Sequence, residues 1–147
     1  MIRSTTVLDD PKMLDLVKKF YPLTSYSKWA DFDDETVLEL FDSIRRRGLM
    51  FVAQEGDDLV GIVAAVAVPF IFNKNITSGH EVIWWVLPEY RKSGIGIQLI
   101  KHIDKVAALK GLKSLQMMRL AESSSELDEV FTKLGYKPTE YCFTKVY

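Results

Sequence analysis

Residues 82–100 read VIWWVLPEYRKSGIGIQLI, and they carry more structural information than any other part of the 147-residue chain. The segment begins with an apolar run, passes a proline, and reaches a loop that contains Gly94 and Gly96. Apolar residues then recur at helical spacing. The pattern predicts a strand over residues 81–87, a tight turn, and a helix over residues 94–110.

The loop before this helix has the features of an anion-binding site. The first N–H groups of a helix lack intrahelical partners and carry the positive end of the helix dipole, so they attract phosphate. Gly94 and Gly96 bring no side chains that would keep a phosphate from the backbone, and Arg91 and Lys92 add positive charge. The alternative is that the two glycines only fit a tight turn.

Two common phosphate-binding motifs do not fit this loop. The dinucleotide fingerprint needs a third glycine where this chain has Leu99, and an acidic residue that the region near Ser114 does not offer. The Walker loop needs Gly-Lys-Ser or Gly-Lys-Thr, which the sequence lacks. Both nucleotide-binding classes are therefore excluded.

The remainder of the chain predicts alternating strands and helices. Further strands are expected at residues 2–7, 49–54, 59–69 and 114–120, with one or two more within residues 136–147. Further helices are expected from Asp9 or Asp10 to Phe20, at residues 33–47, and at residues 123–134, the last with a capping box of Ser123 and Glu126. The order β-α-α-β-β-β-α-β-α-β predicts one α/β domain over residues 1–147 with a mixed sheet.

Composition limits the function classes. Hydrophobic residues make up 48% of the chain, which excludes a disordered protein. The formal net charge of −1 provides no general attraction to nucleic acid or to an anionic membrane. The longest apolar stretch has about a dozen residues, short of the ~20 that span a bilayer.

The few cysteine and histidine residues argue against disulfide and zinc chemistry. Cys142 has no partner for an intramolecular disulfide, which is typical of a reducing compartment. Together with His80 and His102 it does not complete a tetrahedral zinc site without carboxylates, so no metal is expected. The N-terminus lacks the apolar run of a signal peptide, and a cytoplasmic protein is predicted.

The loop sequence resembles a known cofactor motif. Residues 91–96, RKSGIG, match every fixed position of Arg/Gln-x-x-Gly-x-Gly/Ala, the acetyl-CoA-binding motif of the GNAT family of N-acetyltransferases. The preceding VLPEY is a typical entry to that loop, and residues 130–136, VFTKLGY, are similar to the family's Leu-Tyr-Glu-Lys-Leu-Gly-Phe segment. The predicted order of elements is also that of the family, so the resemblance covers essentially the whole chain.

The resemblance implies a fold and a cofactor site. The fold is a mixed, mostly antiparallel sheet flanked by helices and split by a V-shaped cleft, where the pantetheine of acetyl-CoA lies. The backbone of Val86 would bond the pantetheine amides, and Ser124 would contact the cofactor unless it only caps a helix. The pyrophosphate loop would comprise Arg91, Lys92, Ser93, Gly94, Ile95, Gly96 and Ile97.

The family reaction is direct transfer of acetyl from the thioester to a primary amine, and it needs a base. In many members a glutamate early in the strand before the loop takes the proton. Glu81 or His80 lies there, and burial beside an apolar strand would raise the pKa of a Glu81 carboxyl toward the useful range. The alternative is a solvated strand end.

The residue that usually acts as the acid in this family is different in this chain. The tyrosine that protonates the departing thiolate is replaced by Phe131, which has no proton to give. Tyr141 is our candidate for this role, with Ser124 and Tyr136 as alternatives. The thiolate would otherwise leave unassisted, or the chain would be a non-catalytic CoA-binding or interaction domain.

The resemblance implies a small-molecule or peptide amine as the acceptor, and residues 26–34 lie where the family builds its acceptor wall. Asp31, Asp33 and Asp34 would suit a cationic amine, although helix capping explains them equally well. Neither nucleic acid nor a membrane is expected as a partner, and a homodimer is compatible with the sequence. One alternative is acetylation of aminoacyl-tRNA, for which the arginines at residues 45–47 would form a local basic patch.

Overall fold

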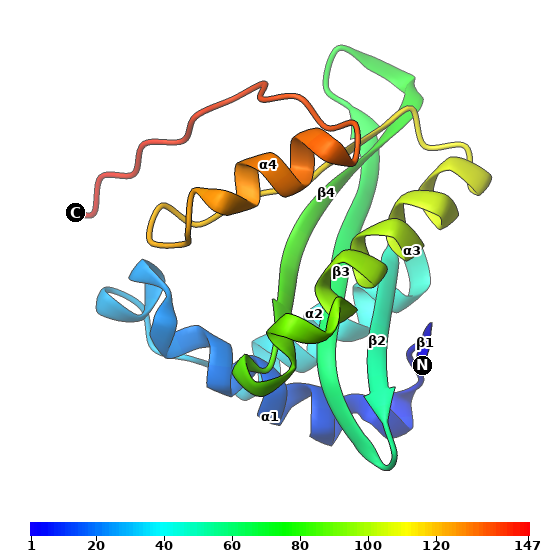
Figure 1. Ribbon diagram of the computed structural model, residues 1–147. Coiled ribbons are helices and arrows are strands. Elements are labelled where there is room, and N and C mark those ends of the chain that lie inside the picture. The colour runs from blue at the N-terminus through cyan, green and yellow to red at the C-terminus, as the bar shows by residue number, and fades with distance from the viewer.

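The computed structural model describes residues 1–147 and centres on one five-stranded sheet with the order β1-β2-β3-β4-β5 (Figure 1). The strands are β1 (Ile2–Ser4), β2 (Leu49–Glu55), β3 (Asp58–Phe70), β4 (Asn73–Val86) and β5 (Ser114–Gln116). The helices are α1 (Asp10–Phe20), α2 (Asp34–Arg47), α3 (Ile95–Leu109) and α4 (Glu126–Lys133). None of these helices combines the length and apolar character needed to cross a membrane.

The sheet is mixed, as predicted. The pairs β1–β2, β2–β3 and β3–β4 are antiparallel, and only β4–β5 is parallel. Short turns join β2 to β3 and β3 to β4, which permits antiparallel pairing, whereas α3 provides the crossover that a parallel pair requires. The predicted α/β class and mostly antiparallel sheet are confirmed.

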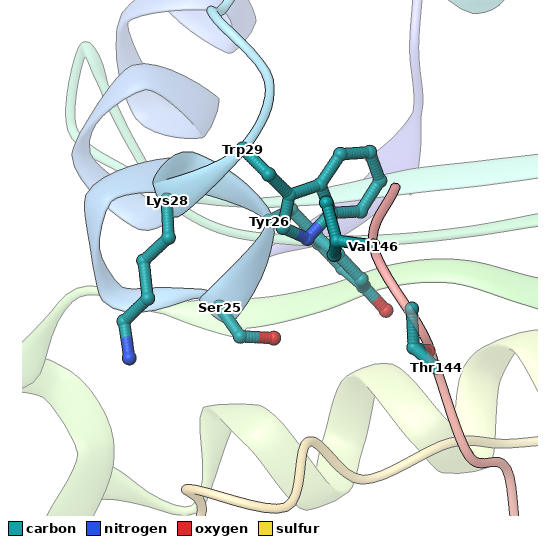
Figure 2. A pocket seen from close by; sticks show the side chains of 6 residues that line it. All are labelled: Ser25, Tyr26, Lys28, Trp29, Thr144 and Val146. Carbon is teal, nitrogen blue, oxygen red and sulfur yellow. The ribbon is translucent and has the colours of Figure 1, made fainter.

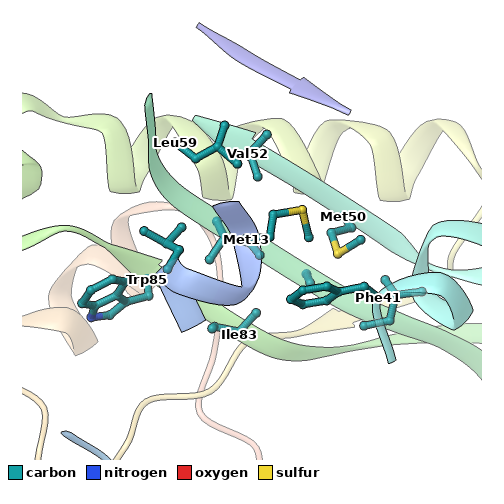
Figure 3. Close-up of a cluster of buried hydrophobic side chains, with 11 residues drawn as sticks. Met13, Phe41, Met50, Val52, Leu59, Ile83 and Trp85 are labelled. Carbon is teal, nitrogen blue, oxygen red and sulfur yellow. The ribbon is translucent and has the colours of Figure 1, made fainter. Parts of the chain in front are cut away.

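Two separate apolar cores cover the two faces of the sheet. Along β3, Ile62 and Ala64 face the cluster under α1 and α2, whereas Val63 and Ala65 face the cluster under α3. Figure 3 shows the first cluster, in which Met13 of α1 packs among side chains of the strands and of α2. The strand β3 is buried on both sides, which explains its unbroken apolar sequence.

The strand β4 is longer than predicted and carries a bulge. Its first half, residues 73–80, lies outside the strand predicted at residues 81–87 and is rich in asparagine, serine and glycine, but it pairs with β3 as a long hairpin. The register then shifts: Ala64 pairs with Ile83 and Ala65 pairs with Glu81, so Val82 is an extra residue. The pairing partner, rather than local composition, defines the strand.

The C-terminal part of the chain departs most from the prediction. The strand expected at residues 114–120 ends at Gln116, and residues 136–147 form no strand. Pro138 has no N–H group to donate, and a three-residue β5 offers a short edge for pairing. The segment runs away from the sheet beside α4 (Figure 1), and Tyr141 and Phe143 are exposed.

Helix caps explain most of the remaining differences. Strand β1 stops at Ser4 instead of Val7 because the backbone N–H of Thr6 donates to Asp9, which turns the chain into α1. Asp33 caps α2 by accepting from the N–H of Thr36 at 2.8 Å.

The predicted capping box of Ser123 and Glu126 is wrong. Helix α4 begins only at Glu126, after the N-cap residue Ser125. The N–H of Glu126 donates instead to the hydroxyl of Ser124, at 3.2 Å, so the neighbouring serine makes the local bond.

Burial of one face of α3 predicts a sharp contrast between two leucines of that helix. Leu99 is fully buried against β3, whereas Leu109 is 77% exposed. Leu99→Ala should lower the free energy of unfolding by about 3 kcal/mol. Leu109→Ala, with the same change in helix propensity, should lower it by less than about 0.5 kcal/mol. Urea denaturation measures both, and equal losses would contradict the packing described.

Candidate functional site

The loop between β4 and α3 has a distinctive backbone. A 3₁₀ turn, Pro88–Ser93, leads to Gly94, whose φ of 83° lies in the left-handed region. The hydroxyl of Ser93 donates to the carbonyl of Tyr90 at 2.6 Å and holds the turn closed. A side chain at Gly94 would be strained, and no atom lies within 4 Å of the place where its Cβ would stand.

The open space at Gly94 adjoins free backbone donors. The first hydrogen bond within α3 runs from the N–H of Gln98 to the carbonyl of Gly94, at 3.1 Å. The earlier N–H groups of the helix therefore lack helical acceptors, and Ile95 has only a long contact, 3.4 Å, with the hydroxyl of Ser93. These donors and the helix dipole fit an anionic group such as a pyrophosphate.

The second glycine of the motif has a different neighbour. A Cβ on Gly96 would lie 3.3 Å from the ring of Trp84, whose indole N–H donates to the carbonyl of Gly96 at 3.1 Å. Gly96 thus allows α3 to pack closely on β4. Arg91 fastens the loop to the same strand, because its Nε donates to the carbonyl of Val86 at 3.2 Å.

The strands β4 and β5 separate directly beside the candidate base. They pair only over residues 78–80 of β4, so the β5-facing edge of residues 81–86, which includes Val86, has no strand partner there. The side chain of Glu81 lies at this fork, where its Oε2 accepts from the N–H of Met118 at 3.1 Å. Glu81 is only 7% exposed, and burial raises its pKa to about 7.

His80, the alternative base, is held by neighbours on both ring nitrogens. Its Nδ1 lies 2.7 Å from the side-chain oxygen of Gln116, and its Nε2 lies 3.1 Å from the hydroxyl of Ser78. Because an amide oxygen only accepts, Nδ1 donates to Gln116. The imidazole therefore braces β4 against β5.

The candidate acids lie in different surroundings. Phe131 packs against Trp84, with ring centroids 5.6 Å apart, and Tyr136 packs against Phe131. Burial raises the pKa of Tyr136, and its hydroxyl donates to Asp104. Tyr141 is 83% exposed in the C-terminal segment.

The expected acceptor wall contains a cavity of about 410 Å³. Tyr26 of the 3₁₀ turn Ser25–Lys28 and Trp29, which directly follows the turn, face Thr144 and Val146 of the C-terminal segment across it (Figure 2). The cavity is lined by aromatic, hydroxyl and aliphatic groups together with one lysine.

Two of the three aspartates predicted for this wall have structural partners instead. Asp33 accepts two hydrogen bonds from Thr36, which lower its pKa, and Asp34 pairs with Lys18 at 2.6 Å. None of the three predicted aspartates lines the cavity.

The predicted basic patch at residues 45–47 is largely neutralised within the chain. Arg45 pairs with Asp10, and Arg46 pairs with Asp42 one helical turn away. Two of the three charges therefore have carboxylate partners, which weakens the case for an RNA-binding surface.

The comparisons with known proteins agree with this geometry. A model of the acetyltransferase (GNAT) family matches residues 11–136. The chain belongs to the GNAT acetyltransferase family. The family prediction made from residues 91–96 is confirmed, and this membership makes the chain an acetyl-CoA-dependent N-acetyltransferase. No curated protein matches the sequence.

Solved GNAT structures share the fold over the full chain. An acetyltransferase from Trypanosoma brucei has 21% identity and a TM-score of 0.75, covering 100% of this chain and 99% of that one. An aminoglycoside acetyltransferase from an uncultured soil metagenomic sample, in complex with sisomicin, has 18% identity and a TM-score of 0.74, covering 100% and 93%. A predicted acetyltransferase from Clostridium acetobutylicum, solved with acetyl-CoA, has 15% identity and a TM-score of 0.74, covering 99% and 95%.

Two contributors to the candidate site were not identified from the sequence. The N–H of Met118 meets Glu81 only because β5 ends two residues earlier, a long-range event with no local signal. The indole N–H of Trp84 donates to the carbonyl of Gly96 and links the strand to the loop. Its proximity to Gly96 in the sequence was the available signal.

The buried Glu81 predicts a dependence of stability on pH. Its pKa is about 7 in the folded protein and near 4.5 when exposed, so the folded state binds the proton more tightly. The free energy of unfolding should fall as pH rises from 4.5 through 7, by about 3 kcal/mol at most. Urea titrations of wild type and Glu81→Gln across this window measure the difference. A difference that does not change with pH would contradict the raised pKa.

Proposed function

We propose that this GNAT enzyme acetylates a primary amine at the fork between β4 and β5, with Glu81 as the general base. The single observation that carries the proposal is the buried Glu81 carboxylate at the point where the two strands separate. The same strand leads directly into the anion-binding loop, so the base and the cofactor loop are held by one rigid element.

The chain's own groups fit acetyl-CoA. The backbone N–H groups of Lys92, Ser93, Gly94, Ile95, Gly96 and Ile97 would hold the pyrophosphate, with Arg91 at the rim. The unpaired edge of β4, including the N–H of Val86, whose carbonyl already accepts from Arg91, would bond the pantetheine amides. Ser124, which bonds the neighbouring N–H of Glu126, is proposed as a further contact. When bound, acetyl-CoA supplies an acetyl group activated as a thioester.

Glu81 is suited to take the proton that the amine must lose. A carboxylate with a pKa of about 7 holds a proton more strongly than an exposed glutamate and is still largely ionised just above neutrality. The N–H of Met118 donates to one carboxylate oxygen and fixes the orientation of the group. The other oxygen remains available to the amine or to a bridging water.

We keep Tyr141 as the proposed acid, and its exposure means that the C-terminal segment must pack onto the site for the hydroxyl to act.

For the acceptor, we propose the cavity between Tyr26, Trp29 and the C-terminal segment. Its aromatic walls and single lysine favour a neutral polar or sugar-like body over a polycation.

We propose a cytoplasmic location, supported by the exposed, unpaired Cys142. A homodimer stays a prediction.

The loop proposal predicts selective loss of acetyl-CoA binding. Gly94 and Gly111 lie at opposite ends of α3, both have positive φ, and both have open space at the Cβ position. Alanine at either should cost a similar stability, about 1 kcal/mol. Only Gly94→Ala should weaken the binding of acetyl-CoA, by roughly tenfold, because its methyl group enters the space proposed for the pyrophosphate. Isothermal titration calorimetry with acetyl-CoA measures this, and equal affinities of the two variants would reject the proposed pyrophosphate site.

The base proposal predicts the kinetic effect of Glu81→Gln. Turnover at saturating acetyl-CoA and amine should fall about 100-fold, and acetyl-CoA affinity should stay within about twofold. In the wild type, kcat/KM should rise across about pH 6 to 8 as Glu81 loses its proton, and the variant should lack this rise. Release of CoA, followed with a thiol reagent across a panel of amines, measures both. Unchanged turnover in the variant would remove Glu81 as base, and binding without turnover for any amine would favour the non-catalytic alternative.

A further inference from the structure

A second cavity lies at the other end of α3, away from the cofactor loop. It has a volume of about 250 Å³ and is enclosed by the end of β1, the junction between α2 and β2, and the second half of α3. His102, Val106 and Lys110 line it from α3. Since a helix rises 1.5 Å per residue, Val106 lies roughly 18 Å along the axis from Gly94. The cavity is therefore separate from the acetyl-CoA loop.

Two residues that line this cavity, Thr5 and Arg45, carry buried side-chain atoms without hydrogen-bond partners. Thr5 is only 7% exposed, and its hydroxyl has no hydrogen-bond partner. Arg45 also lines the cavity, and its Nε and Nη1 are buried without partners. These three atoms are the complete set of buried side-chain nitrogen and oxygen atoms without partners in the protein. Buried polar groups in proteins are nearly always hydrogen-bonded, so three such atoms at one cavity point to a ligand.

The same groups define the chemistry of that ligand. The guanidinium of Arg45 can only donate, and its planar fork matches the oxygens of a carboxylate or phosphate. Its Nη2 is engaged by Asp10, which leaves the Nε and Nη1 sides for an acceptor. Lys110 adds an exposed positive charge at the rim, so the positive charges at the cavity exceed the single carboxylate that pairs with Arg45.

The other walls of the cavity are mainly apolar, and its volume of about 250 Å³ limits the ligand to a small molecule. Phe51 and Val106 are apolar, and the ring of His102 packs edge-on against Phe51 at 4.5 Å between centroids. Gly48 leaves room between α2 and β2, because a side chain there would collide with the carbonyl of Ala65. The cavity therefore combines donors for an oxyanion head group with apolar surface for a short carbon chain.

We propose that this cavity binds a small organic oxyanion, a phosphate monoester or a carboxylate of a few carbon atoms, between Thr5 and Arg45. The turn that carries Thr5 is preorganised for this role. Arg3 and Asp9 form a bidentate pair across the turn, with distances of 2.7 and 2.8 Å, and Asp9 also accepts from the N–H of Thr6. Ligand binding would complete the hydrogen bonds of groups that the fold already holds in place.

The test uses the full-length protein saturated with acetyl-CoA, so that the cofactor loop does not take up the probes. The probes are inorganic phosphate, glycerol 3-phosphate and butyrate, and binding is measured by calorimetry and by thermal unfolding. At least one of the two organic probes should bind and raise the melting temperature. Binding of the phosphate compound alone or of the carboxylate alone supports the proposal and identifies the head group.

The decisive variant is Thr5→Val, which keeps the shape of the side chain and removes the hydroxyl. Because that hydroxyl has no hydrogen bond to lose, the melting temperature of the free variant should be unchanged or raised. Its affinity for the bound probe should fall at least fivefold, and its affinity for acetyl-CoA should be unchanged. Arg45→Lys, which keeps the charge and loses the fork, supplies a second variant should Thr5→Val fold poorly.

Gly94→Ala is the matched control, since it alters only the cofactor loop. It should leave the affinity of the oxyanion probe unchanged. The proposal is overturned by absence of binding for all three probes, by equal affinity in wild type and both cavity variants, or by loss of probe binding in Gly94→Ala.

Discussion

The structure depends on the unequal pairing of β4 with its two neighbours. On one side β4 pairs with β3 along nearly its whole length, which anchors it in the core, and on the other side it pairs with β5 over three residues. The remaining edge, residues 81–86, therefore has no strand partner, although Arg91 donates to the carbonyl of Val86 there. Since β4 continues into the loop before α3, the unpaired edge and the helix N–H groups without acceptors form one continuous surface, on which we propose that acetyl-CoA binds.

Glu81 lies where that separation begins, and its position has a thermodynamic cost. Burial disfavours the ionised carboxylate, and the single N–H of Met118 offsets only part of the penalty. The bulge at Val82 places Glu81 opposite Ala65, which belongs to the core under α3. The free-energy cost of the buried acid is tolerated because β3 and the two apolar clusters fix β4 independently. Such local costs are common at functional sites.

The sequence predicted those features that have local causes. The helices α1, α2 and α3 followed from apolar periodicity and caps such as Asp33, and the loop at Gly94 followed from its glycines and its place before a helix. The beginning of β4, the bulge at Val82 and the early end of β5 depend on register between distant strands, for which residues 73–82 give no local signal. The strands predicted at residues 136–147 failed for a related reason, since alternation of apolar residues predicts a strand only where an edge is available to pair.

The substitution of phenylalanine for the family's usual tyrosine has a structural counterpart. Phe131 packs edge-on against Trp84, and Trp84 in turn donates to the carbonyl of Gly96 in the first turn of α3. Residue 131 therefore supports the indole that holds α3 against β4. An aromatic ring at this position retains that packing with or without a hydroxyl. The loss of the hydroxyl therefore removes a proton donor and leaves the packing of the loop before α3 intact. Binding of acetyl-CoA and protonation of the leaving thiolate are thus separable in this chain, and any proton donor must come from another segment.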